Sequence, residues 1–573
     1  MKRNLPILFA IVVVVALPFL FERDREVVSS PDDTVVIVSP HPESIRQEFA
    51  RAFRRWYRER TGRTVYVDFR TPGGTSSIIT YLDSEYTNNF RNHWVDALGR
   101  SWSMEVQNSY ADHRVSLPDD PAADSLAQRA RRAFLESEVG SGIDLFFGGG
   151  SFDFIRQTRK GQLVSSRFLT EHAGFFADYP DGIPRSYAGE PFYDAEGRWF
   201  GAVLSSFGII FNRDALRRVG IERDLESWDD LGDPRLFRQV AVADPSHSGS
   251  MNKIFEIMIQ NKMQGRYAQV REEAGGTVSA EAEHRARAEG WMDGMRLIQR
   301  IAANARYFTD SAPIPNIDVA IGDCAAGIAI DFYGRYQEET IRSRGGGDRF
   351  AYITPIGASA VSVDPIGLMR GAPNRDVAEA FIQFVMSPEG QALWNFEVGT
   401  AVSVPADRNP YGEEVTLRGP ATFPLRRPPI LPLLYDAAFE EYRSDPDVNP
   451  YREVAGFDYR PEWTSHLFNE QRFLIRVIFI DILSELRAAM AAIIAARSEG
   501  RTAEADRAYA VLSDLSRVSY ENVGTRIKEV LTLRSAIEEV RLARELSGHF
   551  REQYREAERI ARGSRRGGTG RGE

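Results

Sequence analysis

Short apolar segments alternate with amphipathic helical segments over residues 33–440, and this alternation constrains the fold more than any other feature of the sequence. At its start, TVVIVSPHPE (34–43) is typical of a buried strand, residues 43–60 show helical spacing of apolar side chains, and VYVDF (65–69) is typical of a second strand. Strand, helix and strand in this order predict a parallel α/β sheet. Because single cores stop growing at about 250–300 residues, a run of this length predicts two lobes.

Breaks in the pattern divide the chain further. Residues 84–137 are polar and poorly periodic, whereas 410–465 are rich in proline and tyrosine. The expected organisation is a signal or anchor with its linker (1–32), a first part of lobe 1 with an insertion at 84–137 (33–206), lobe 2 (207–357), a second part of lobe 1 with a wrapping segment (358–465), a helical extension (466–562) and a disordered tail (563–573).

The helical extension carries Leu, Val and Ile at heptad-like spacing, which predicts three packed helices. Charged residues such as Arg476 and Asp481 within its first helical stretch argue against a membrane span. We expect a packed structural appendage. A docking arm, an oligomerisation element and a brace against lobe 2 remain alternatives.

The N-terminus indicates export. Lys2 and Arg3 precede the apolar run 5–21, which is the pattern of a signal peptide. No small-residue cleavage motif follows, and the run is just long enough to span a bilayer. We therefore favour an uncleaved transmembrane anchor over a cleaved signal. Either places the rest of the chain in a periplasmic or extracytoplasmic location, and the anchor would tether it to the cytoplasmic membrane.

Composition and missing motifs exclude several functions. The net charge of −10 argues against nucleic-acid binding. The single cysteine, Cys324, lies between apolar residues and is expected to be a small buried side chain. The chain has no P-loop, H-E-x-x-H, paired-cysteine or G-x-S-x-G motif. We therefore expect no cofactor, no catalytic residues and no resident metal.

Three segments combine glycines with small polar residues where a predicted strand leads into a helix. Unpaired N–H groups and the positive end of the helix dipole make such a turn suited to an anion, although each alone is also an ordinary helix cap. Ligands of α/β sheets bind at the carboxyl ends of strands. The candidate residues in TPGGTSSI, GGGS and ADPSHSGSMNK are Gly73, Gly74, Thr75, Ser76, Gly149, Gly150, Asp244, Ser246, Ser248 and Gly249.

Several segments, in order, resemble the ferric-iron/organic-anion group of bacterial extracellular solute-binding proteins, the capture subunits of ABC importers. They include VVIVSPHPE, GGTSSII, DLFFGGGSFDF, FGIIFN, GIAIDFYGRY and AFIQFVMSPEGQALW, and the resemblance covers about residues 35–405. It implies a two-lobed periplasmic-binding-protein type II fold, whose lobes are joined by hinge strands that we place near 201–212 and 350–366. The C-terminal all-α extension is not part of the family pattern.

The resemblance also bears on the ligand. Of the four residues that hold iron in ferric-binding members, His41 and Tyr333 are retained, while Phe332 and Gly149 stand at the positions of a tyrosine and a glutamate. Ferric iron therefore becomes the alternative, with His41 and Tyr333 as its ligands, and a small anionic, phosphorylated organic solute is favoured. We expect Ser39 and the hydroxyls of the turns at its anionic end, and polar contacts from His41, Asp331 and Tyr333. Ser205 and Ser206, at the first crossing, complete the candidate site.

These expectations define a binding protein without catalysis, which passes its solute to the membrane permease of an ABC importer. A membrane-tethered ligand sensor is the second hypothesis. An enzyme on the same scaffold is the third, although no nucleophile–base pair or metal set is evident.

Overall fold

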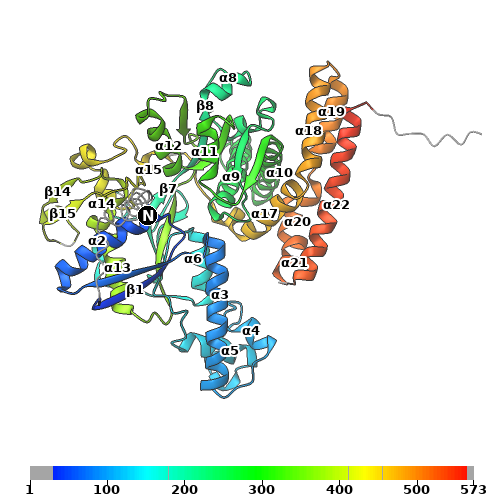
Figure 1. Cartoon of the computed structure of the whole chain (residues 1–573). Coiled ribbons are helices and arrows are strands. Elements are labelled where there is room, and N and C mark those ends of the chain that lie inside the picture. Colours follow the sequence, from blue (N-terminus) through cyan, green and yellow to red (C-terminus); the bar gives the residue numbers. More distant parts are fainter. Residues whose placement is uncertain (1–29, 179, 411, 455, 534, 564–573) are drawn as a thin grey trace, which may run out of the picture.

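The computed structural model describes residues 30–563 apart from 179, 411, 455 and 534. Two α/β lobes lie side by side, and a bundle of C-terminal helices packs against one of them (Figure 1). The apolar run 5–21 and most of the C-terminal tail lie outside the described residues. Within the described part of the chain, no helix has the length and apolar character needed to cross a membrane.

Lobe 1 is built on a six-stranded mixed sheet. Its central path runs through β2 (Val65–Arg70), β1 (Asp33–Val38), β3 (Leu145–Phe147), β13 (Ser362–Met369) and β4 (Leu163–Val164), with β7 (Phe200–Ser205) also paired to β13. The first three strands are parallel, and β13 is antiparallel to β3. The sheet packs with helices that include α2 (Glu43–Thr61), α3 (Thr75–Asn92), α6 (Ser151–Lys160), α13 (Arg375–Met386) and α14 (Pro388–Asn395).

Helix α2 shows why the sequence pattern predicts this lobe. Ile45, Phe49, Phe53 and Trp56 recur at helical spacing, and all four are buried. Phe53 contacts Phe381 of α13 edge-to-face at 4.8 Å. The apolar stripe thus joins two helices that are far apart in the sequence.

Lobe 2 contains a five-stranded sheet. The strands follow the order β10 (Ala305–Thr309), β9 (Val240–Ala243), β11 (Ala326–Ile330), β8 (Phe207–Asn212) and β12 (Phe350–Ile353). Its helices include α9 (Gly249–Glu273), α10 (Ala280–Asn304), α11 (Ile314–Ile321) and α12 (Asp331–Ser343). Cys324 is buried here, as its apolar neighbours predict, and burial raises the pKa of its thiol to about 12.

Two strand crossings join the lobes, at the places the sequence indicates. Strand β7 ends at Ser205 in lobe 1 and β8 begins at Phe207 in lobe 2, so Ser206 alone separates them. The return path runs from β12 to β13 through residues 354–361. The predicted two-lobed α/β fold with crossing strands is confirmed.

A third crossing has no counterpart in the sequence predictions. Tyr451, in α15 (Pro450–Glu453), donates its hydroxyl to Ile430 O of lobe 1 at 2.5 Å. A few residues later, Arg460 N donates to Gln260 Oε1 on α9 at 2.9 Å. The wrapping segment therefore leaves lobe 1 and continues over lobe 2 into α16 (Pro461–Thr464).

The insertion in lobe 1 has a small core of its own. Helix α3 continues to Asn92, and α4 (Met104–Ser109) and α5 (Leu126–Glu136) follow. Phe90 stacks on Tyr110 with ring centroids 4.8 Å apart, and Phe134 meets Tyr110 edge-to-face at 5.0 Å. These rings hold together a segment whose polar composition gives no periodic signal.

The C-terminal extension shares a continuous apolar core with lobe 2. Its elements are α17 (Phe468–Ile475), α18 (Leu483–Ser498), α19 (Thr502–Leu512), α20 (Tyr520–Asn522), α21 (Lys528–Thr532) and α22 (Ala536–Ala561). Trp291 Nε1 of α10 donates to Val518 O at 2.9 Å, and Gln299 Nε2 donates to Leu512 O at 2.9 Å. The extension therefore packs on α9 and α10 of lobe 2 (Figure 1).

Candidate functional site

A cavity of about 570 Å³ lies between the lobes. Lobe 1 contributes α6 and the hairpin of β5 (Ser186–Tyr187) and β6 (Glu190–Pro191), and lobe 2 contributes the start of α9. Further walls come from the first crossing, the third crossing and the start of α17 (residues 459–469). The other lining residues are Ala111 and His113 of the insertion, Ile330, Ser362, Asp364 and Lys528. Its size is that of pockets that enclose small organic molecules.

Two helix N-termini border this cavity. Gly150 is the N-cap of α6, and Ser248 caps α9 by accepting a hydrogen bond from Met251 N at 3.2 Å. In the described part of the chain, no acceptor takes the amide hydrogens of Ser151 or Gly249. These free donors and the positive ends of both helix dipoles favour an anion in the cavity.

The three consecutive glycines serve two different purposes. Gly148 and Gly149 have φ values of +96° and +115°, which side chains rarely adopt. A Cβ on Gly148 would lie 2.6 Å from His41 Nε2, and one on Gly149 would lie 3.0 Å from Thr75 Cγ2. Both glycines therefore let the turn approach other parts of lobe 1. Gly150 alone has open space where a Cβ would stand.

The three predicted anion-binding turns do come together. Gly74 lies close to His247 O across the gap between the lobes, since a Cβ added to Gly74 would be 3.7 Å from that oxygen. A Cβ added to Gly249 would be 3.6 Å from Asp153 Oδ2. Asp244 holds its turn by accepting from Ser246 N at 2.7 Å and from Ser246 Oγ at 2.6 Å. Of the sixteen predicted residues, the cavity is lined by Gly149, Gly150, Ser205 and Gly249, while Ser76 and Ser246 line an adjoining cavity.

A second group of predicted residues lies behind the cavity rather than on its wall. His41 is buried, and burial together with nearby Arg427 holds its pKa well below the usual value. Asp331 is fully buried and accepts the Ser206 hydroxyl at 3.3 Å, and burial raises its pKa to about 6. Ten of the predicted residues line neither cavity, and of these Gly73 and Gly74 are exposed to solvent: Ser39, His41, Gly73, Gly74, Thr75, Ser206, Asp244, Ser248, Asp331 and Tyr333.

Arg427, which sequence reasoning missed, occupies the centre of this buried group. It pairs with Asp364 Oδ2 at 2.7 Å, donates to Ser205 Oγ at 2.5 Å and lies 4.4 Å from the centre of the Phe332 ring. Its charge acts on both His41 and Tyr333. The only signal in the sequence was an arginine pair in a proline-rich segment, which indicates surface rather than core.

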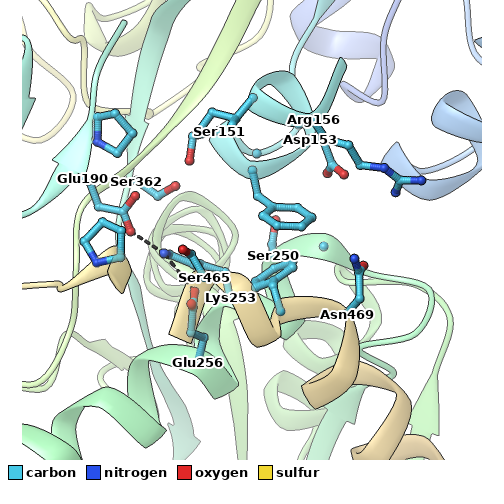
Figure 2. A pocket seen from close by; sticks show the side chains of 18 of the residues that line it. Ser151, Asp153, Arg156, Glu190, Ser250, Lys253, Glu256, Ser362, Ser465 and Asn469 are labelled. Carbon is cyan, nitrogen blue, oxygen red and sulfur yellow. Dashed lines mark hydrogen bonds and ion pairs between the residues drawn. The ribbon is translucent and has the colours of Figure 1, made fainter. Parts of the chain in front are cut away.

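A buried ion cluster connects the lobes at one end of the cavity (Figure 2). Lys253 of α9 pairs with Glu190 of the lobe 1 hairpin and with Glu256 Oε2 at 3.0 Å. Glu256 Oε1 also accepts from Tyr459 OH at 2.9 Å, and burial raises the pKa of Glu190. The cluster thus ties lobe 1, lobe 2 and the third crossing to one another.

At the other end of the cavity, Figure 2 shows Asp153, Arg156 and Asn469. Phe152 of α6 contacts Phe468 of α17 with ring centroids 4.3 Å apart. The extension therefore forms part of the cavity wall.

The middle third of the chain matches a family model. Residues 203–395 match the family described as bacterial extracellular solute-binding protein. A curated relative from Haemophilus influenzae, described as an uncharacterized protein, is 22% identical over 190 residues, which is 33% of this chain and 45% of the relative. This chain therefore spans less than half the length of that relative.

Solved structures also align with this chain. They include the periplasmic binding protein AfuA from Actinobacillus pleuropneumoniae with fructose-6-phosphate bound, at 16% identity and a TM-score of 0.42 over 78% of this chain and 99% of that one. The periplasmic binding protein P5PA aligns at 14% identity and a TM-score of 0.45 over 78% and 100% of the two chains. Iron-bound HitA from Pseudomonas aeruginosa aligns at 12% identity and a TM-score of 0.42 over 77% of this chain and 99% of that one.

Proposed function

We propose that this protein, whose residues 203–395 match the family of bacterial extracellular solute-binding proteins, captures a small anionic organic solute between its lobes and delivers it to the permease of an ABC importer. A phosphorylated compound is the ligand class we favour. The family is one of binding proteins rather than enzymes, and its extracellular character agrees with a periplasmic location. Anchoring through the apolar run 5–21 is part of the proposal and concerns residues outside those described.

One observation carries the choice of an anion. The N-terminal ends of α6 and α9, one from each lobe, border the same enclosed space. A carboxylate or phosphate placed there would accept hydrogen bonds from both lobes at once, because the first amides of a helix have no acceptor within it. Such a ligand stabilises the closed arrangement, which is the behaviour required of a capture protein.

The same region is unfavourable for ferric iron. The Arg427 guanidinium is buried beside His41 and Tyr333, the two retained candidates for metal ligands, and its charge repels a cation. Across the described residues, no group of three or more His, Cys, Asp or Glu side chains is placed to hold a metal ion. An imidazole and one phenol are a poor set for a hard trivalent ion.

A thermal-shift screen on residues 33–573 tests the proposal. The panel contains fructose 6-phosphate, inorganic phosphate, a phosphonate, gluconate and ferric citrate. A ligand at 100 times its dissociation constant adds about 2.7 kcal/mol to the free energy of unfolding, which raises the melting temperature measurably. A shift with a phosphorylated compound supports the proposal. A shift with ferric citrate alone would overturn it in favour of the iron alternative.

A further inference from the structure

A second cavity of about 730 Å³ adjoins the first. Both cavities are bordered by His113, Asp153, Arg156, Asn469 and Lys528, so they lie against each other at these five residues. The second is lined by α3, the insertion and α6 of lobe 1, and by α17 and α21 of the extension. We call it the outer chamber, and the first cavity the inner chamber.

Three cations from three different helices line the outer chamber. They are Arg156 of α6, Arg472 of α17 and Lys528 at the start of α21. Among the residues that the structure describes, no carboxylate lies within ion-pair distance of any of the three. The only polar side-chain contact of Arg472 in that part of the chain is a hydrogen bond to Asn469 Oδ1 at 2.9 Å. Unpaired cations held together in a cavity are typical of an anion site.

Among the described residues, the acidic side chains of the chamber form no ion pair with these three cations. Asp83 pairs with Lys160, and Glu539 pairs with Arg476 at 3.5 Å. Two carboxylates remain, Asp153 and Glu470, and burial raises the pKa of each. Burial also lowers the pKa of Arg472, and the charges of Asp153 and Glu470 oppose that shift. A bound anion would add to the negative charge that faces these cations.

The extension creates this arrangement. Arg472 and Lys528 both follow the third crossing, and the Phe152–Phe468 contact sets the start of α17 against lobe 1. Without residues 466–533, the cleft would keep Arg156 as the only one of the three cations. The helices therefore do more than support lobe 2.

We propose that the C-terminal helices complete the ligand site and add a second anion subsite at Arg156, Arg472 and Lys528, so that the ligand carries two anionic groups joined by a short polar body. This inference rests on the proposed function. One anionic group lies at the N-termini of α6 and α9 in the inner chamber, and the other lies in the outer chamber. The polar body passes between the chambers at the five residues that border both.

Isothermal titration calorimetry of residues 33–573 with two matched pairs of probes tests the inference. The pairs are fructose 6-phosphate with fructose 1,6-bisphosphate, and gluconate with glucarate. In each pair the second probe has one more anionic group. A charge-assisted hydrogen bond is worth about tenfold or more in affinity, so the doubly substituted probe of the preferred pair is expected to bind at least tenfold more tightly.

Variants identify the subsite. Arg472→Gln is expected to remove most of the advantage of the second anionic group while leaving the affinity for the singly substituted probe unchanged, because Arg472 lines only the outer chamber. Lys528 borders both chambers, so Lys528→Gln is expected to weaken both probes and the doubly substituted one more. Arg526→Gln is the matched control, because Arg526 is two residues from Lys528 but is exposed and pairs with Glu545 at 2.6 Å. Melting temperatures of both variants separate the loss of the subsite from a loss of folding.

The outcomes separate the two proposals. Equal affinities within each pair, unchanged by Arg472→Gln and Lys528→Gln, would overturn the second subsite and leave the proposed function standing. Equal losses in all three variants would overturn it as well, because a general charge effect would then explain them. Absence of binding by all four probes would count against the proposed anion function and remove the basis of the inference.

Discussion

Replacing Gly150 by aspartate tests whether the inner chamber binds an anion. An ideal Cβ on Gly150 meets no atom within 4 Å, and the residue has a φ of −109°, so a side chain fits without backbone strain. Aspartate and asparagine are both good N-caps, so each should leave α6 intact. Gly150→Asn is therefore a control of the same shape without the charge.

The expected magnitude follows from Coulomb's law. Two unit charges about 5 Å apart at an effective dielectric constant of about 20 repel each other by about 3 kcal/mol. This corresponds to roughly a hundredfold weaker binding. The Asp and Asn side chains can both accept hydrogen bonds from the first amides of α6 and so compete with the ligand for them. This competition lowers the affinity of both variants. The difference in affinity between the two variants therefore measures the effect of the added charge.

Isothermal titration with the best phosphorylated ligand of the thermal-shift panel measures this difference. We expect Gly150→Asp to bind roughly a hundredfold more weakly than Gly150→Asn, with less difference at high salt. Equal dissociation constants for the two variants would refute the reasoning, because an anion at the start of α6 must respond to a carboxylate placed beside it.

Two further predictions concern the buried group and the third crossing. Burial raises the pKa of Asp331 to about 6, above its unfolded value of about 4, so its stabilising contribution is complete below pH 4 and is lost as the pH rises through 6. Because the Asp331→Asn side chain cannot lose a proton, the variant escapes this loss. Its free energy of unfolding relative to wild type, measured by urea titration, should rise by about 2–3 kcal/mol between pH 4 and pH 7. A difference that stays constant with pH would contradict this. Gly189→Ala should lower the melting temperature more than Gly99→Ala, because both glycines have positive φ but only at Gly189 would a Cβ meet Tyr459 O, 1.5 Å away. Equal losses would show that the contact with the third crossing does not matter.

Periodic patterns predict the two lobes because each strand and helix must bury one face. The stripe of α2 and the apolar runs at 200–212 illustrate this, and Ser206 marks the first crossing. The three glycine-containing turns were also predicted to lie together, and the structure brings Gly74 and Gly249 to contacts across the gap between the lobes. Such turns are recognisable because their residue types have few other uses.

Residues that act through long-range contacts could not be predicted in this way. Arg427 comes from a proline-rich segment, and only the folded chain shows that it pairs with Asp364 behind the cavity. Lys253 and Arg472 lie on amphipathic helices, where a charged side chain normally indicates the solvent-facing side. Their roles depend on the position of the third crossing, for which the sequence has no local signal.

The third crossing has a consequence for the rate at which a ligand leaves. A cleft joined by two strand crossings opens by bending them, whereas here Lys253–Glu190, Phe152–Phe468 and the segment from Tyr451 to Arg460 must also separate or stretch. These contacts join the lobes on more than one side of the chamber. Under the proposed function they predict a long residence time for a captured solute, and an unloading step that moves this segment away from one lobe.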